Sequence, residues 1–266
     1  MNLSILRFRI ADAFRKAFGP RKHGVIICVL TVCIAVSVIV WIYSVMGRLQ
    51  KEWQLRAAGA DHKSVVSRLL VIRIALNTYS EVMGCLPAAV VRNNDGTPIY
   101  SWRVALGTLV EEAHREGWRH FAKDEHWQSP ANKILREHGG SMGFGYKGES
   151  SAKFLAVTGS GTAFEDGKCR KLDEMPKGLI VIVEKSDSSF FWMEPGDVEL
   201  ESLRGLSYMT CGEQFARSRS SFHVLLASGE IWELTRDTPL SVFIECASAD
   251  TANSKAVENL SHYRLQ

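Results

Sequence analysis

The sequence has little net charge, no repeated segment and no cysteine pair at a metal-binding spacing. Its 266 residues carry a net charge of only +3, which is too small to indicate a nucleic-acid-binding protein. No tandem repeat or low-complexity tract is present. Hydrophobic residues make up 46% and charged residues 23% of the chain, which is typical of globular rather than disordered proteins.

Patterns that organise catalysis or bind cofactors are also missing. Residues 159–162 are glycine-rich, but they lack the lysine and the strand-loop-helix context of a phosphate-binding loop, so a β-turn is expected. No nucleophile elbow orders the Ser, His and Asp residues. His114, His120 and His126 lie six residues apart and share no helical face, which favours surface or capping roles over metal binding. We therefore expect no enzyme, cofactor or metal, although an unrecognised catalytic site stays an alternative.

The six cysteines fall into two groups. Cys28 and Cys33 lie in an apolar run, where they act as small hydrophobic residues. The rest of the chain contains Cys85, Cys169, Cys211 and Cys246. In an oxidising compartment these four would form one or two disulfides, and the alternative is free buried thiols; three pairings are open.

The longest hydrophobic run, residues 25–46, predicts a transmembrane helix. Its 22 residues carry no charge, and at about 1.5 Å per residue they span roughly 33 Å, enough for a hydrocarbon core of about 30 Å. The run is longer than the apolar part of a signal peptide, and no cleavage site follows closely. We therefore expect an uncleaved anchor.

Basic residues are concentrated before this run, where six Lys and Arg stand against a single acid, Asp12. By the positive-inside rule, the chain is predicted to be a single-pass protein of the inner (cytoplasmic) membrane. Periodicity over residues 3–18 predicts a basic amphipathic helix on the inner leaflet, with a solvated tail as the alternative. The predicted segments are 1–23 in the cytoplasm, 24–47 as the membrane helix, 48–61 as a stalk and 62–266 as an extracytoplasmic domain. The lipid bilayer is thus an expected partner, and nucleic acid is not.

The predicted domain begins with helices and ends with strands. Helical spacing of apolar residues predicts a long helix that Gly84 ends, and Ser129-Pro130 begins a short helix. The helical half comprises a helix over 65–83, a turn over 92–98, a helix over 102–116, a short helix over 129–138 and a glycine-rich loop over 138–151. The remainder is predicted as strands over 154–158, 179–184, 222–227 and 231–234, with a hairpin turn at Ser228-Gly229 between the last two. Residues 189–193 are a further candidate for strand pairing nearby.

Five blocks follow one another between residues 62 and 245. They are Leu86–Ala89 with 95–104, Asp124–Asn132, Leu155–Phe164, Val183–Glu184 with Trp192–Asp197, and Phe222–Ala227. Their order and spacing resemble a large planctomycete family of pseudopilin-like proteins of unknown function, many with a general-secretion-pathway G-type N-terminus. The resemblance implies an α+β, pilin-like fold, in which a long N-terminal transmembrane helix and further helices pack on an antiparallel β-sheet.

The resemblance also implies structural roles for the residues that match the family blocks. These residues are Asp95, Gly96, Ser101, Trp102, Arg103, Trp127, Ser129, Pro130, Asn132, Gly159, Glu184, Trp192, Glu194 and Pro195. Two features of the family are absent. Gly24 stands where a cleavage glycine would, but the fifth position after it is Val29 and not the glutamate used in fibre assembly. A C-terminal His and Asp-Gly pattern is replaced by Ser218 and Ser228-Gly229.

Two functions are compatible with these features. The first is a non-enzymatic, membrane-anchored envelope protein with an interaction or scaffolding role, linked to secretion machinery or other envelope proteins. The alternative is an extracytoplasmic module that binds a glycan or a peptide through the loops after Gly139 and Gly196.

Overall fold

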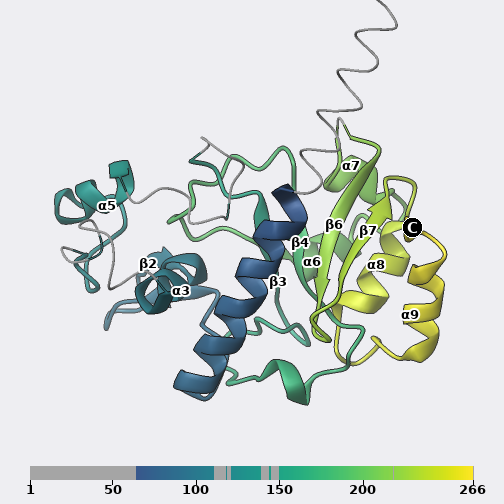
Figure 1. The fold of residues 1–266 in the computed structure, drawn as a ribbon, viewed down its shortest axis with the longest axis horizontal. Coiled ribbons are helices and arrows are strands. Elements are labelled where there is room, and N and C mark those ends of the chain that lie inside the picture. The colour runs from purple at the N-terminus through teal and green to yellow at the C-terminus, as the bar shows by residue number, and fades with distance from the viewer. Residues whose placement is uncertain are drawn as a thin grey trace, which may run out of the picture. The chain divides into compact units, whose positions relative to one another are not determined.

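The computed structural model describes residues 64–110, 118, 121–138, 144, 150–217 and 219–265, whose fold is drawn in Figure 1. The chain divides into two compact units, Met1–Asp61 and His62–Gln266. All described residues belong to the second unit. The predicted cytoplasmic segment, membrane helix and stalk lie outside the described residues.

A helix over residues 64–83 opens the described part, which confirms the prediction made from periodicity. Gly84 ends it with φ of 81°, and the Gly84 N–H donates to the carbonyl oxygen of Ser80 at 2.9 Å. Glycine accepts this left-handed conformation without steric cost, so it terminates the helix cleanly. The buried face of the helix consists of Val65, Leu69, Ile72 and Leu76, each at most 1% exposed.

A small antiparallel hairpin and three short helical elements follow. Strands β1 (Val90–Arg92) and β2 (Pro98–Ser101) flank the predicted turn, where the Asn93 side chain accepts the N–H groups of Asp95 and Thr97. Helix α3 (Trp102–Val110) begins directly after β2. The 3-10 helix η1 (Pro130–Asn132) and helix α5 (Lys133–His138) confirm the short helix predicted from Ser129-Pro130.

The main sheet has five strands. They are β3 (Phe154–Thr158), β4 (Ile180–Glu184), β5 (Val198–Glu199), β6 (Ser221–Leu226) and β7 (Ile231–Thr235), in the spatial order β5-β3-β4-β6-β7. Four of them match predicted strands to within a residue or two. The predicted segment 189–193 is not a strand, although Phe191 forms an isolated bridge to Ser151.

Helices cover both faces of the sheet. Because side chains alternate along a strand, Phe222 and Val224 of β6 pack with helix α8 (Leu240–Ala247), whereas Leu225 packs with the 64–83 helix. Helices α6 (Leu200–Arg204) and α9 (Ser254–Ser261) join the α8 side. Figure 1 shows the 64–83 helix in dark blue beside β3 and β4, with α8 and α9 in yellow. The short elements η2 (Leu172–Glu174) and α7 (Cys211–Gln214) connect strands.

The C-terminal helices are a feature that the strand-rich prediction missed. In α8, the run Val242-Phe243-Ile244 favours a strand by composition. Burial of Leu240, Phe243 and Ala247 on one helical face overrides that preference. Asn253 caps helix α9, because its side chain accepts the N–H groups of Lys255 and Ala256.

The predicted fold class is wrong as stated. The described residues are α+β, but the sheet is mixed, because Val198 and Glu199 of β5 pair in parallel with Val157 and Thr158 of β3. A buried contact explains this pairing: Asp197, just before β5, accepts the N–H of Ala156 in β3. Within the described ranges, no helix combines the length and the apolar character that crossing a membrane requires, and the 64–83 helix carries charged residues. A pilin-like antiparallel sheet with a transmembrane helix is therefore not the fold of these residues.

Candidate functional site

Arg103, in the first turn of α3, lies at the centre of a buried group of hydrogen bonds. Its side chain is 0% exposed. Nε donates to the carbonyl oxygen of Trp192 at 3.0 Å, and Nη2 donates to those of Glu194 at 3.0 Å and Gly196 at 2.9 Å. Nη1 donates to Oδ1 of Asp197 at 2.8 Å. A guanidinium stays charged when buried, so it needs acceptors of this kind.

Asp197 joins three elements through one carboxylate oxygen. Besides Arg103, its Oδ1 accepts hydrogen bonds from Nε1 of Trp102 at 3.0 Å and from the N–H of Ala156 at 2.8 Å. Burial raises the pKa of the Asp197 carboxyl above its ordinary value, and the charge of Arg103 opposes this shift. No described residue hydrogen-bonds the buried Oδ2. The carboxylate thus fixes α3, β3 and β5 to one another.

Ser101 and Trp192 complete this group. The Ser101 hydroxyl donates to the carbonyl oxygen of Trp192 at 3.1 Å, and the Ser101 N–H donates to that of Met193 at 3.0 Å. The Glu194 carboxylate accepts the N–H of Phe191 at 3.0 Å. We call the whole set the arginine cage: Ser101, Trp102, Arg103, Trp192, Glu194, half-buried Pro195 and Asp197. Two of the sequence blocks, far apart along the chain, therefore meet in one structural frame.

A second group of predicted residues fixes the segment 121–138. Trp127 stacks on Phe191, with ring centroids 5.3 Å apart and an interplanar angle of 13°. Ser129 occupies the N-cap position of η1, although its hydroxyl makes no capping hydrogen bond, and Pro130 is the first residue of η1. The buried Asn132 amide accepts the N–H of Ala122 at 2.9 Å and donates to the Ala122 carbonyl oxygen at 3.2 Å. These contacts fix the position of the segment.

The remaining predicted glycine positions lie in turns. Asp95 and Gly96 are exposed between β1 and β2. Gly159 begins a turn after β3, where its carbonyl oxygen accepts both the N–H and the hydroxyl of Thr162. The β-turn predicted for residues 159–162, in place of a phosphate cradle, is confirmed.

Glu184 belongs to a separate polar cluster at the end of β4. Its side chain is 1% exposed. Oε1 accepts a hydrogen bond from Arg219 at 3.0 Å, and Oε2 lies 2.7 Å from Nδ1 of His223 and 3.1 Å from the His223 N–H. With a proton on Nδ1, this pair has the geometry by which a carboxylate orients an imidazole. Both carboxylate oxygens are engaged, so Glu184 holds β4 to β6.

The sequence did not predict His223 and Arg219 as partners of Glu184. The available signal was a histidine on the same side of β6 as Leu225, within the otherwise apolar run from Phe222 to Leu226. Nearby, the Ser221 hydroxyl donates to Glu233 at 2.5 Å, so its described partner is a carboxylate rather than the imidazole that activates a nucleophile.

The features predicted or considered for ligand and metal binding either make local contacts or lie outside the described residues. Nδ1 of His126 accepts the N–H of Gln128 at 3.2 Å, a local capping contact, whereas His114 and His120 lie outside the described residues. Among the residues that the structure describes, no three His, Cys, Asp or Glu side chains are grouped for a metal ion. Of the two loops proposed for ligand binding, the one after Gly139 is mostly outside the described residues, and Gly196 is held by Arg103.

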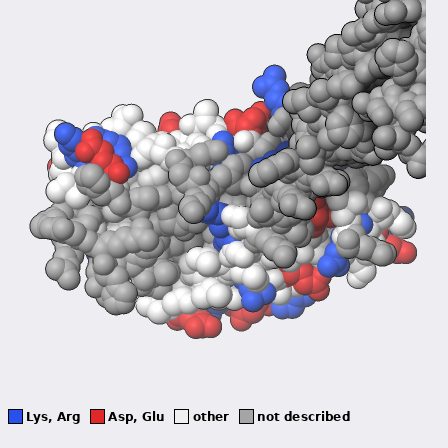
Figure 2. Space-filling view, turned by 45° about the horizontal axis from the view of Figure 1, so that its top comes forward, with Lys and Arg blue, Asp and Glu red and all other residues white. Residues whose placement is uncertain are grey.

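Three of the surface pockets lined by described residues have volumes of about 170, 290 and 290 Å³. Sites for small molecules usually measure roughly 300–1,000 Å³, so these pockets are small. Figure 2 shows acidic and basic side chains interspersed over the described part of one face.

Comparisons with protein-family models, with curated proteins and with solved structures find no match. The pseudopilin-like resemblance therefore stays a prediction.

Proposed function

We propose that the chain is a non-enzymatic envelope protein of the inner membrane, whose extracytoplasmic domain contacts other envelope proteins. The observation that carries this proposal is that side chains from the predicted sequence blocks are buried inside the domain. Trp102 and Arg103 are 0% exposed, as is Asn132, and all three are hydrogen-bonded within the domain. Buried side chains that are hydrogen-bonded to one another stabilise the domain and do not reach a partner. We therefore assign the function to the exposed surface of the domain.

Cross-linking in the native membrane tests this proposal. A photo-reactive amino acid is placed at exposed apolar positions of the domain: Val71, Ile74 and Val82 of the long helix, which are 50–64% exposed, and Tyr208, which is 83% exposed. Buried Leu69, at 0% exposure, is the matched control on the same helix. We expect a discrete adduct with an envelope protein from one or more exposed positions and none from Leu69.

Two results would contradict the proposal. One is the absence of any adduct, including self-adducts, from every exposed position. The other is a specific thermal shift of several degrees when the full-length chain meets a glycan or a peptide, because capture of a ligand would then explain the domain better than protein contact.

A further inference from the structure

Two of the four domain cysteines lie together at the end of the 64–83 helix. Cys85 follows Gly84 directly, and the Cys169 thiol contacts the Gly84 carbonyl oxygen at 3.8 Å. One residue further along both segments, the Leu86 N–H donates to the Arg170 carbonyl oxygen at 2.7 Å. The backbones of the two segments are thus held side by side, and both cysteines line the same surface pocket.

The neighbouring thiol of Cys169 raises the pKa of Cys85, with partial burial as a smaller cause, whereas the charge of Lys171 acts in the opposite direction. Cys85 is half-buried and Cys169 is exposed, so a soluble oxidant reaches the pair.

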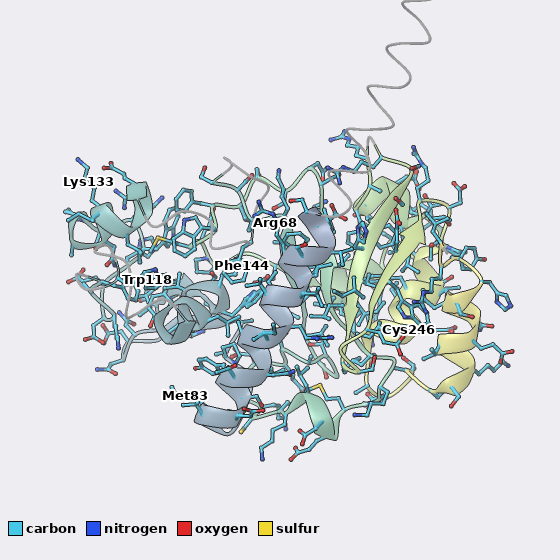
Figure 3. The ribbon with its side chains drawn as sticks, viewed as in Figure 1. Arg68, Met83, Trp118, Lys133, Phe144 and Cys246 are labelled. Carbon is cyan, nitrogen blue, oxygen red and sulfur yellow. The ribbon has the colours of Figure 1, made fainter. Side chains whose placement is uncertain are left out.

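The other two cysteines are placed differently. Cys211 and Cys246 are both 0% exposed and belong to the core on the α8 side of the sheet. Burial raises the pKa of Cys246 to about 12 and that of Cys211 further. Figure 3 shows Cys246 on α8, well away from Met83 at the end of the long helix. Cys85 follows Met83 closely in the chain. Neither buried thiol has the access that oxidation requires.

The loop that presents Cys169 is fixed by its own contacts. Arg170 forms an ion pair with Glu165, whose carboxylate also accepts the N–H of Gly161 at 3.2 Å. The hydrogen bond from Arg170 lowers the pKa of Glu165 below its ordinary value. Because Gly84 and Leu86 contact Cys169 and Arg170, the backbones that carry the two cysteines are held together before any disulfide forms.

We propose that Cys85 and Cys169 form a disulfide, and that Cys211 and Cys246 stay free thiols. The oxidant is an external disulfide, such as oxidised glutathione or the active-site disulfide of an oxidoreductase. One thiolate attacks it and releases a thiol, and the second thiolate then displaces the remaining half as another thiol. The two cysteines lose two protons and two electrons, and the external disulfide gains both. Formation of this disulfide in the cell rests on the proposed extracytoplasmic location. The ability of the two thiols to pair does not depend on that location.

The test uses the full-length chain isolated without reductant, with free thiols trapped at once by acid and N-ethylmaleimide. Proteolysis and mass spectrometry then search for a peptide pair linked through Cys85 and Cys169, two hydrogen atoms lighter than the separate peptides. A second sample is reduced and re-oxidised with glutathione. In Cys169→Ser, alkylation of Cys85 is expected to rise at least about tenfold over the parent. Cys211→Ala is the matched control and should retain the linked pair.

Each outcome decides a separate point. The linked pair in both samples supports the proposal. The pair after glutathione treatment alone supports the pairing but contradicts the extracytoplasmic location. Free Cys85 and Cys169 in both samples, a bond to Cys211 or Cys246, or a disulfide between two chains would overturn the proposal.

Discussion

At the scale of single residues, Arg103 is a charged side chain that the fold surrounds with hydrogen-bond acceptors. It is fully buried, and its hydrogen bonds reach three carbonyl oxygens and one carboxylate. A buried charge of this kind adds little net stability beyond what apolar packing would give, but removing one partner leaves the other uncompensated. The arginine cage therefore specifies where the segment before β5 lies more than it adds free energy.

Replacing Arg103 should destabilise the protein strongly. In Arg103→Met, Asp197 and three carbonyl oxygens lose their buried donor, and the free energy of unfolding should fall by about 3–5 kcal/mol. Arg204→Ala is the control, because Arg204 forms an exposed pair with Glu201, and its removal should cost about 0–1 kcal/mol. Denaturant unfolding of the full-length chain in detergent, followed by tryptophan fluorescence, measures both. Equal losses in the two variants would show that the cage is not a structural centre.

At the scale of elements, the 64–83 helix has two faces with different roles. Its inner face packs on Phe154, Ala156 and Leu225 of the sheet. Its outer face exposes Val71, Ile74 and Val82. The helix is therefore held by packing on one side and presents apolar side chains on the other.

A pair of truncations on this helix separates the two faces. Leu69→Ala removes a side chain at 0% exposure, and the cavity should cost about 2–5 kcal/mol of unfolding free energy. Ile74→Ala changes a side chain at 59% exposure, and its effect should stay within about 0.5 kcal/mol. If Ile74→Ala costs as much as Leu69→Ala in the same unfolding experiment, the outer face is covered in the native protein.

At the scale of the whole molecule, the chain joins a first unit, Met1–Asp61, to the domain that the structure describes. The first unit contains the apolar run that predicts the anchor, and its basic flank predicts the orientation. Both the proposed contacts with envelope proteins and the proposed disulfide in the cell depend on that orientation.

A labelling experiment measures the orientation directly. In a background with Cys85→Ser and Cys169→Ser, Tyr208→Cys places a thiol on an 83% exposed position of the domain. A membrane-impermeant maleimide should label it in intact spheroplasts, because the domain is proposed to face away from the cytoplasm. Ser4→Cys, in the predicted cytoplasmic segment, should react only after permeabilisation. The reverse pattern would contradict the proposed topology.

Much of the described fold follows from local sequence. Apolar spacing predicted the 64–83 helix, because a 3.6-residue period places Val65, Leu69, Ile72 and Leu76 on one side. Short β-branched runs predicted four strands, and Ser129-Pro130 predicted η1. These features depend on neighbours in the chain, which is why sequence alone determined them.

Only the tertiary structure decided how distant segments meet. The two-residue strand β5 has no sequence pattern of its own, and its parallel pairing follows from the contacts of Asp197 with Arg103 and Ala156. Glu184 finds His223 because β4 and β6 are neighbours in the sheet. Likewise, four cysteines left three pairings open, and the proposed pair of Cys85 and Cys169 arises because the end of a helix and a later loop run side by side. Such contacts depend on the packing of the whole domain.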